Sequence, residues 1–330
     1  MQTDTLKKLG IFFLQKGIRM VTLLVAICFI SFLLIKNSPI DPVQAYIGGD
    51  MLQVSSEQRE QIAAYWGLDQ PVGMQFLNWG SALLHGDLGT SMIFRRPVAE
   101  VIGERFASSI ILMMSAWILS GVIGFVLGIV AAMKKGTWLD RIIKSYCYTL
   151  ASTPTFWMGL LVLIVFSVWL GWFPVGMGVP AGVLAEDVSI VDRIKHLILP
   201  ALTLSIVGVS NVALHTRQKM IDVLASEYIL FARARGEKGF QLFWRHGLRN
   251  VALPAITLQF AAFSELFGGA VLAEQVFSYP GLGQATVEAG IRGDVPLLLG
   301  IVIFSTLFVF IGNLLADLIY LILDPRMREG

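Results

Sequence analysis

The chain has 330 residues, of which 55% are apolar and 15% are charged, and its mean hydropathy is +0.71. Soluble globular domains carry near ~25% charged residues, so this composition excludes an ordinary soluble domain. The two cysteines form no CxxC pair, which excludes a disulfide framework and a redox motif, and the net charge of +2 says little about partners.

Six long apolar segments predict six transmembrane helices in an all-α, polytopic membrane protein. A spanning helix needs ~20 predominantly apolar residues. The first segment, Met20–Ile35, is short but is extended by Arg19, whose charged head can reach the interface. We expect it to be a permanent span and not a cleavable signal peptide, because no small-x-small site follows it. Four later segments are uncharged throughout: 106–133, 145–185, 197–214 and 295–316. The remaining segment, 251–277, contains two glutamates and no other charged residue.

The basic residues predict the orientation of these helices. With the N-terminus inside, 17 of the 25 lysines and arginines fall in the segments that face the cytoplasm. Because cytoplasmic loops are enriched in Lys and Arg, both termini are expected in the cytoplasm of a bacterial inner membrane. A nucleic-acid-binding face is excluded, because the basic residues lie at the ends of spans.

The stretch after the first span predicts a small external helical segment, 38–105. It holds eight acidic and four basic residues. A helix is expected to start at Ser55, which can cap it, and a second helix is expected over Val72–Leu84, ending at Gly86. The predicted division is 1–37 (stub and first span), 38–105, 106–325 (five-helix core) and 326–330 (cytoplasmic tail).

Two local patterns concern helix packing. Gly124 and Gly128 form a GxxxG pair, which lets two helices approach closely. Pro154 opens the third span, where it is expected to kink the helix and free backbone carbonyls. Either packing or a role in a translocation pathway would account for that kink.

A basic segment between the fourth and fifth spans reads EYILFARARGEKGFQLFWRHGLRN, residues 227–250. A short helix is expected from Glu227 to Arg235, ending at Gly236, and a second from Gly239 into Asn250. A membrane protein needs no such element merely to fold. The segment is therefore a candidate for transmitting force to a partner below the bilayer.

Two glutamates interrupt the fifth span. Glu265 is the fifteenth of 27 residues, near mid-bilayer, where a carboxylate costs at least ~2.5–3.5 kcal/mol unless it is paired or hydrated. It is expected to face a pathway or a polar partner, and a hydrogen-bonded role in helix packing stays open. Glu274 is expected on the opposite side of the helix, nearer the outer surface. One carboxylate makes no metal site.

Ordered motifs over residues 80 to 328 resemble one family. They are GDLGTS (86–91), STPTFW (152–157), His196 with LPALTL (199–204), ARARG with RHGLRN (232–250), FSYPGLG (277–283) and the closing DPRMR (324–328). They resemble the ATP-binding-cassette (ABC) importer permeases of the dipeptide, oligopeptide and nickel family. The wider superfamily has Leu-Pro where this chain has Leu248-Arg249, which indicates the peptide/nickel branch.

The resemblance implies a type I ABC importer permease fold and no enzyme activity in this chain. It implies a second permease, two ATPase subunits that bind ATP and magnesium, and an external substrate-binding protein, with no cofactor or metal on this chain. The implied ATPase-coupling residues are Glu227, Ala232, Arg233, Ala234, Arg235, Gly236, Arg245, His246, Leu248 and Arg249, the alanines and Gly236 because small residues suit a partner's groove. Candidate pathway residues are Pro154, Glu265, Gly268, Gly269 and Glu274. Candidate binding-protein docking residues are Tyr279, Pro280, Gly281 and Asp294.

Two other classes of protein also have long apolar helices. A self-sufficient secondary transporter or channel would need a charged coupling site within the spans, for which Glu265 is the candidate. An intramembrane enzyme would need a Ser/His, paired Asp or HExxH constellation there, and the chain has no such set and no GxxxxGK[ST] phosphate loop. The cargo stays open among dipeptides, oligopeptides, nickel and metal chelates.

Overall fold

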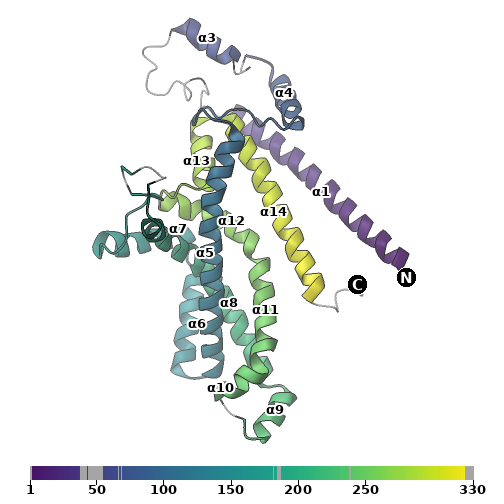
Figure 1. The fold of residues 1–330 in the computed structure, drawn as a ribbon, viewed down its shortest axis with the longest axis vertical. Helices are drawn as coiled ribbons and strands as arrows, with labels where there is room; N and C mark the ends of the chain where they lie inside the picture. The colour runs from purple at the N-terminus through teal and green to yellow at the C-terminus, as the bar shows by residue number, and fades with distance from the viewer. Residues whose placement is uncertain are drawn as a thin grey trace. The chain divides into compact units, whose positions relative to one another are not determined.

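The computed structural model describes residues 2–37, 43, 55–65, 67, 69–180, 182–183, 187–237 and 239–323. These residues are mostly helical, and their one β-bridge is an isolated pair, Thr90 and Pro97. The helices of the first half are α1 (Gln2–Lys36), α3 (Ser56–Tyr65), α4 (Val72–Leu84), α5 (Val98–Met133), α6 (Trp138–Ala151), α7 (Thr155–Leu163) and the π-helix η2 (Ile164–Trp169). Those of the second half are α8 (Ile190–Leu224), α9 (Glu227–Ala234), α10 (Gly239–Leu242), the π-helix η3 (Phe243–Gly247), α11 (Leu248–Ala261), α12 (Phe263–Val276), α13 (Leu282–Arg292) and α14 (Val295–Leu323) (Figure 1).

Several of these helices are long and apolar enough to cross a membrane. Among the described residues four qualify alone, in α1, α5, α8 and α14. Two more spans result only if each of two bent pairs crosses as a unit: α6 with α7 and η2, bent by 108°, and α11 with α12, bent by 62°. Four of the predicted spans therefore match continuous helices, and the full count of six stays a prediction.

The two breaks differ in their cause. At the first, α6 ends at Ala151 and α7 begins after Pro154, in keeping with the poor helical propensity of the residue before a proline. The proline thus separates two helices instead of kinking one. At the second, α11 ends at Ala261 and α12 begins at Phe263, with no proline at the junction.

The chain divides into two compact units, of which the larger comprises 108–284 and 312–330. Within it α8 is central and packs against α6, α7, α11 and α12. The predicted close approach of the GxxxG pair is confirmed. A Cβ on Gly124 would lie 2.8 Å from the Val209 carbonyl oxygen, and one on Gly128 would lie 2.6 Å from the Ala213 carbonyl oxygen. The glycines therefore bring α5 into backbone contact with α8.

The other unit comprises 1–107 and 285–311. Its helix α4 has the predicted bounds, and Ser55 caps α3 as expected, because its hydroxyl accepts from the Gln58 amide at 3.2 Å. Phe76 on α4 packs edge-on against Phe29 and Phe32 of α1. The aromatic contact fixes α4 beside the first long apolar helix.

The helix α5 begins at Val98, eight residues before its uncharged stretch. The extra turns carry Glu100 and Glu104, which pair with Arg96 on the exposed surface, so the helix continues beyond its apolar part. The predicted boundary at residue 105 falls inside this helix. The tail, 326–330, lies outside the described residues, and the predicted domain division stays a prediction.

Candidate functional site

The segment 227–250 forms the helix–turn–helix that the sequence predicts at its start. The helix α9 covers Glu227–Ala234, and Gly236 follows with φ +92°, a left-handed conformation that favours glycine. The second helix differs from the prediction. It does not stop near Asn250 but continues from α10 through η3 into α11, so the segment is joined directly to that longer helix.

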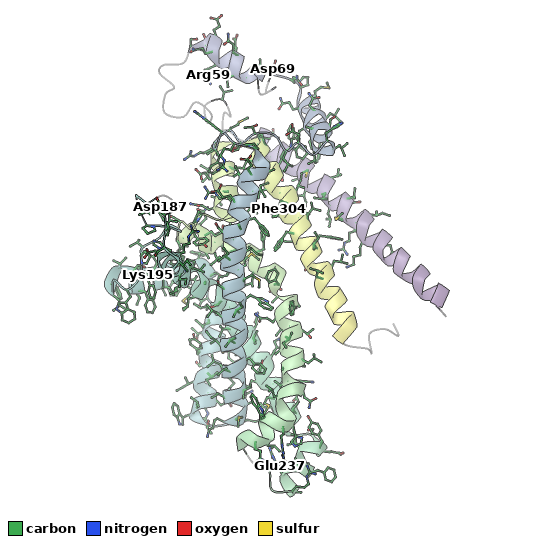
Figure 2. All side chains as sticks on the ribbon, in the orientation of Figure 1. Arg59, Asp69, Asp187, Lys195, Glu237 and Phe304 are labelled. Atoms are coloured by element: carbon green, nitrogen blue, oxygen red, sulfur yellow. The ribbon has the colours of Figure 1, made fainter. Side chains whose placement is uncertain are left out.

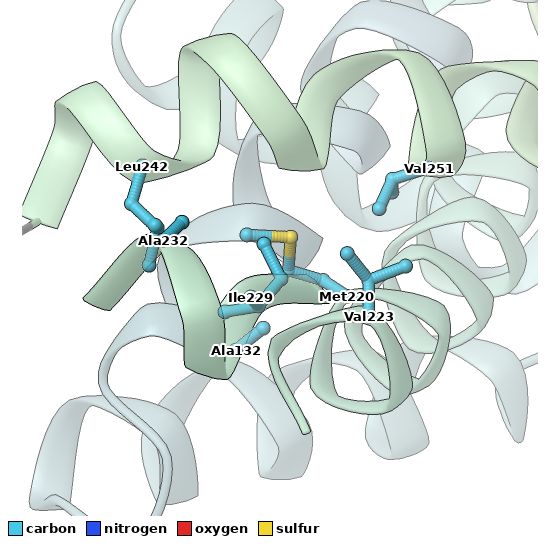
Figure 3. Close-up of a cluster of buried hydrophobic side chains, with 7 residues drawn as sticks. All are labelled: Ala132, Met220, Val223, Ile229, Ala232, Leu242 and Val251. Atoms are coloured by element: carbon cyan, nitrogen blue, oxygen red, sulfur yellow. The ribbon is translucent and has the colours of Figure 1, made fainter. Parts of the chain in front are cut away.

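One face of α9 is anchored to the rest of the unit. Seven buried side chains from α5, α8, α9, α10 and α11 converge there: Ala132, Met220, Val223, Ile229, Ala232, Leu242 and Val251 (Figure 3). Ala232 is 3% exposed, and Leu248 packs against the same cluster. These two predicted contact residues therefore pack inside the chain, and the prediction that Ala232 offers a small surface to a partner is wrong.

The outer face of the segment is large and apolar instead of small. Phe231 is 72% exposed and Trp244 is 61% exposed, and Tyr228 and Leu230 are exposed beside them. Sequence reasoning missed these residues. The available signal was helical spacing, since Ile229 and Ala232 lie three residues apart on one face and leave the apolar side chains between and beside them to the rest of the helix surface.

Charged groups hold the turn between α9 and α10. Glu237, labelled in Figure 2, accepts a hydrogen bond from the His246 ring at 3.0 Å and pairs with Arg235 at 3.4 Å and Arg245 at 3.8 Å. The predicted residues Glu227, Arg233 and Ala234 are exposed on α9. The side chain of Arg249 lies outside the described residues.

Glu265 lies at the second helix break, in the first turn of α12, and its side chain is exposed. It borders a cavity of about 210 Å³ that is lined by α5, α8, α11 and α12. The cavity therefore lies at the carboxylate that the sequence places near mid-bilayer. Gly268 on the same helix is exposed, whereas Gly269 lets α12 approach α8, since a Cβ there would lie 2.9 Å from Leu204.

The prediction that Glu274 faces a pathway is wrong, because its side chain is 0% exposed. Its carboxylate accepts hydrogen bonds from the Ser109 hydroxyl at 2.5 Å and from the Gln284 amide at 3.1 Å. The Ser109 oxygen in turn accepts from the Leu282 amide at 2.8 Å. A Cβ on Gly281 would overlap this carboxylate. Glu274 thus fastens the FSYPGLG turn to α5 and α12.

The predicted docking residues are also mostly internal. Asp294 is 0% exposed and accepts hydrogen bonds from the Ser91 hydroxyl at 2.6 Å and from the amides of Ile93 and Leu297. Tyr279 and Gly281 are buried and Pro280 is half-buried. Burial, reinforced by the charge of Glu274, raises the pKa of Tyr279 to about 12. Tyr279, Gly281 and Asp294 hold loops in place and offer little surface to a binding protein.

Comparison with known proteins decides the family. Residues 124–329 match the model of the binding-protein-dependent transport system inner membrane component, and residues 10–113 match the model of its N-terminal region. The chain belongs to this family.

Relatives align over nearly the whole permease. The oligopeptide transport system permease protein AppB of Bacillus subtilis is 35% identical over 318 residues, 96% of this chain and 99% of that protein. A putative peptide transport system permease protein of Brucella abortus is 36% identical, over 96% of this chain and 98% of its own length. The glutathione transport system permease protein GsiC of Salmonella typhimurium is 35% identical, over 96% and 98%.

The family membership confirms an ABC importer permease of the peptide/nickel type. This multi-pass membrane component transports and does not catalyse, and it works with ATPase and substrate-binding partners. A self-sufficient secondary transporter or channel, the alternative drawn from Glu265, does not describe this family.

One ion pair in the permease was not predicted from the sequence. Asp140 of α6 is held by Arg217 of α8 through two hydrogen bonds, of 2.6 Å and 2.8 Å, and also accepts from the Gly136 amide at 3.0 Å. Neither residue stood out in the sequence. The available signal in the sequence was an acidic residue, Asp140, shortly after the turn residues Gly136 and Thr137.

Proposed function

We propose that this permease pairs with a second, similar permease to form the route for a peptide cargo. Two ATPase subunits, which bind ATP and magnesium, drive the cycle, and an external binding protein delivers the cargo. The named relatives support peptides over nickel, because their names specify oligopeptide, peptide and glutathione transport. Within the described residues, no group of three or more His, Cys, Asp or Glu side chains is arranged to hold a metal ion.

The segment 227–250 is the proposed contact with an ATPase subunit. The observation that carries this proposal is the exposed apolar face of Tyr228, Leu230, Phe231 and Trp244, mounted on the buried cluster around Ile229. Exposed aromatic residues rimmed by arginines are typical of protein interfaces. Arg233, Arg235 and Arg245 form that rim, and the rigid anchoring of α9 would pass a push from the ATPase into α8 and α11.

The same proposal fixes the membrane arrangement. Six spans, with α6–α7–η2 and α11–α12 crossing as broken helices, put both termini and the segment 227–250 in the cytoplasm, as the distribution of basic residues favours. The external binding protein would dock over exposed parts of the outward-facing segments. The cavity beside Glu265 would line the route.

A substitution on the exposed face tests the coupling role. We expect Phe231→Asp to leave the permease inserted in the membrane but to abolish co-purification of the ATPase subunits and the ATP hydrolysis that cargo-loaded binding protein stimulates. A charge in the centre of an apolar contact costs binding, whereas the exposed position costs the free permease little.

The matched control is Ile190→Asp, an equally exposed apolar residue at the opposite end of α8. It is expected to retain the ATPase subunits. Normal coupling in Phe231→Asp, at an unchanged level of the permease in the membrane, would remove the role proposed for this segment.

A further inference from the structure

On one side of the cavity at the break between α11 and α12, the polar groups of α5 and α11 form hydrogen bonds with one another. The Gln259 amide nitrogen donates to the Trp117 carbonyl at 2.5 Å and to the Ser120 hydroxyl at 2.9 Å, and the Trp117 indole donates back to the Gln259 carbonyl at 2.9 Å. These bonds fix α5 to α11. The polar residues that α8 and α12 contribute to the lining take no part in these bonds.

The other side presents exposed polar side chains. Asn211 and His215 border the cavity from α8, four residues apart and therefore on one face of the helix. Glu265 borders it from α12. In the part of the chain that the structure describes, the Glu265 carboxylate makes no hydrogen bond or ion pair with the protein. A carboxylate in this position within an apolar span needs either water or a ligand.

The charge of the lining selects the class of ligand. Among the described residues that border the cavity, Glu265 carries the only fixed charge, and His215 is the only other titratable group. Neither lysine nor arginine is present in that set. The cavity therefore favours a cation over an anion.

The volume limits the size of the ligand. Pockets that enclose a small-molecule ligand commonly have volumes of ~300–1,000 Å³, whereas this cavity has about 210 Å³. It suits one end group of an extended molecule better than the whole molecule.

We infer that this cavity receives the protonated amino terminus of a peptide in transit, with Glu265 as its charge partner and the Asn211 carbonyl oxygen as a further acceptor. This inference rests on the proposed peptide cargo. The rest of the peptide would lie outside the cavity, along the route shared with the second permease. A carboxylate that only water contacts is the competing account, and the test separates the two.

The test measures how strongly the cavity prefers a cation. Ala261, an exposed residue of its lining, is replaced by cysteine in a Cys28→Ser, Cys147→Ala background of the complete transporter in membranes. Methanethiosulfonates with a cationic, a neutral and an anionic tail then label the thiol, each rate being divided by that of a free thiol. We expect the cationic reagent to exceed the anionic one by about tenfold, and Glu265→Gln to bring the ratio close to one.

Asp222→Asn is the matched control. Asp222 lies on the same helix as Asn211 but eleven residues further on, about 16 Å along the axis, and accepts from Gln218 at 3.0 Å. Its loss is expected to leave the labelling ratio unchanged. Equal rates for the two charged reagents in the parent, or a ratio that Glu265→Gln does not alter, would overturn the inference. So would failure of all three reagents to label.

A second measurement identifies the ligand group. Dialanine amide, which carries a free ammonium, is expected to slow labelling by the neutral reagent at least threefold at millimolar concentration, and its N-acetyl derivative is not. Equal effects of the two compounds would contradict recognition of the ammonium. Labelling requires no transport, so its outcome does not depend on whether the complex takes up peptides. Peptide uptake tests the proposed function separately.

Discussion

Two glutamates nine residues apart on α12 have opposite surroundings. Glu274 is fully buried and is held by Ser109 and Gln284 at the end of the helix, whereas Glu265 borders an open cavity where the helix begins. Both lie in the apolar segment 251–277, for which a membrane span is predicted, and an unsatisfied carboxylate is costly there. One is satisfied by donors from the protein, and the other is left for water or a ligand.

The comparison separates a structural role from a functional one on physical grounds. A carboxylate with two internal donors and no exposed surface can fix a loop but cannot meet a cargo. A carboxylate that is exposed in a cavity adds little to the fold but remains available. The surroundings of each carboxylate decide which of the two roles it has, and the spacing of the two residues along the helix does not.

The largest effect is expected for Glu274→Ala. The substitution leaves the Ser109 hydroxyl and the Gln284 amide without their acceptor and creates a cavity where the side chain was, a loss of about 3–5 kcal/mol in the free energy of unfolding. Thermal denaturation of the purified complex in detergent, and the amount of permease in the membrane, measure it. Glu265→Ala is the matched control and is expected to leave the melting temperature unchanged. Equal losses in the two variants would contradict the contrast drawn here.

A smaller effect is expected for Ser109→Ala. It removes one donor to Glu274 and the acceptor of the Leu282 amide, while Gln284 still donates to the carboxylate. The expected loss is about 1–3 kcal/mol, measured by the same denaturation. Ser108→Ala, one residue away, serves as control. A loss as large as that of Glu274→Ala would show that the hydroxyl, and not the carboxylate, is the centre of this network.

Local features of the fold followed from the sequence. The bounds of α4, the end of α9 at Gly236 and the close approach at Gly124 and Gly128 all depend on residues close in the chain or on side-chain size. Apolar stretches likewise predicted where the long helices lie. These features need no knowledge of distant partners.

The errors concern residues whose partners are distant. Glu274 meets Ser109 across 165 positions, and Asp294 meets Ser91 across 203. Nothing in the order of residues indicates these contacts, so both carboxylates looked like candidates for function. Ala232 was misjudged because a small residue suits an inner face as well as an outer one. The apolar character of Phe231 and Trp244, within a basic segment, was the overlooked signal.

The most direct test of the account is ATP-driven uptake by the complete transporter in proteoliposomes. The account predicts that labelled peptide accumulates only when this permease, its partner permease, both ATPase subunits, the loaded binding protein and ATP are all present, and that an ion gradient cannot replace ATP. It also predicts that Glu265→Gln lowers uptake while the ATPase subunits still co-purify. Peptide accumulation by this permease alone, driven by a proton or sodium gradient, would contradict the account.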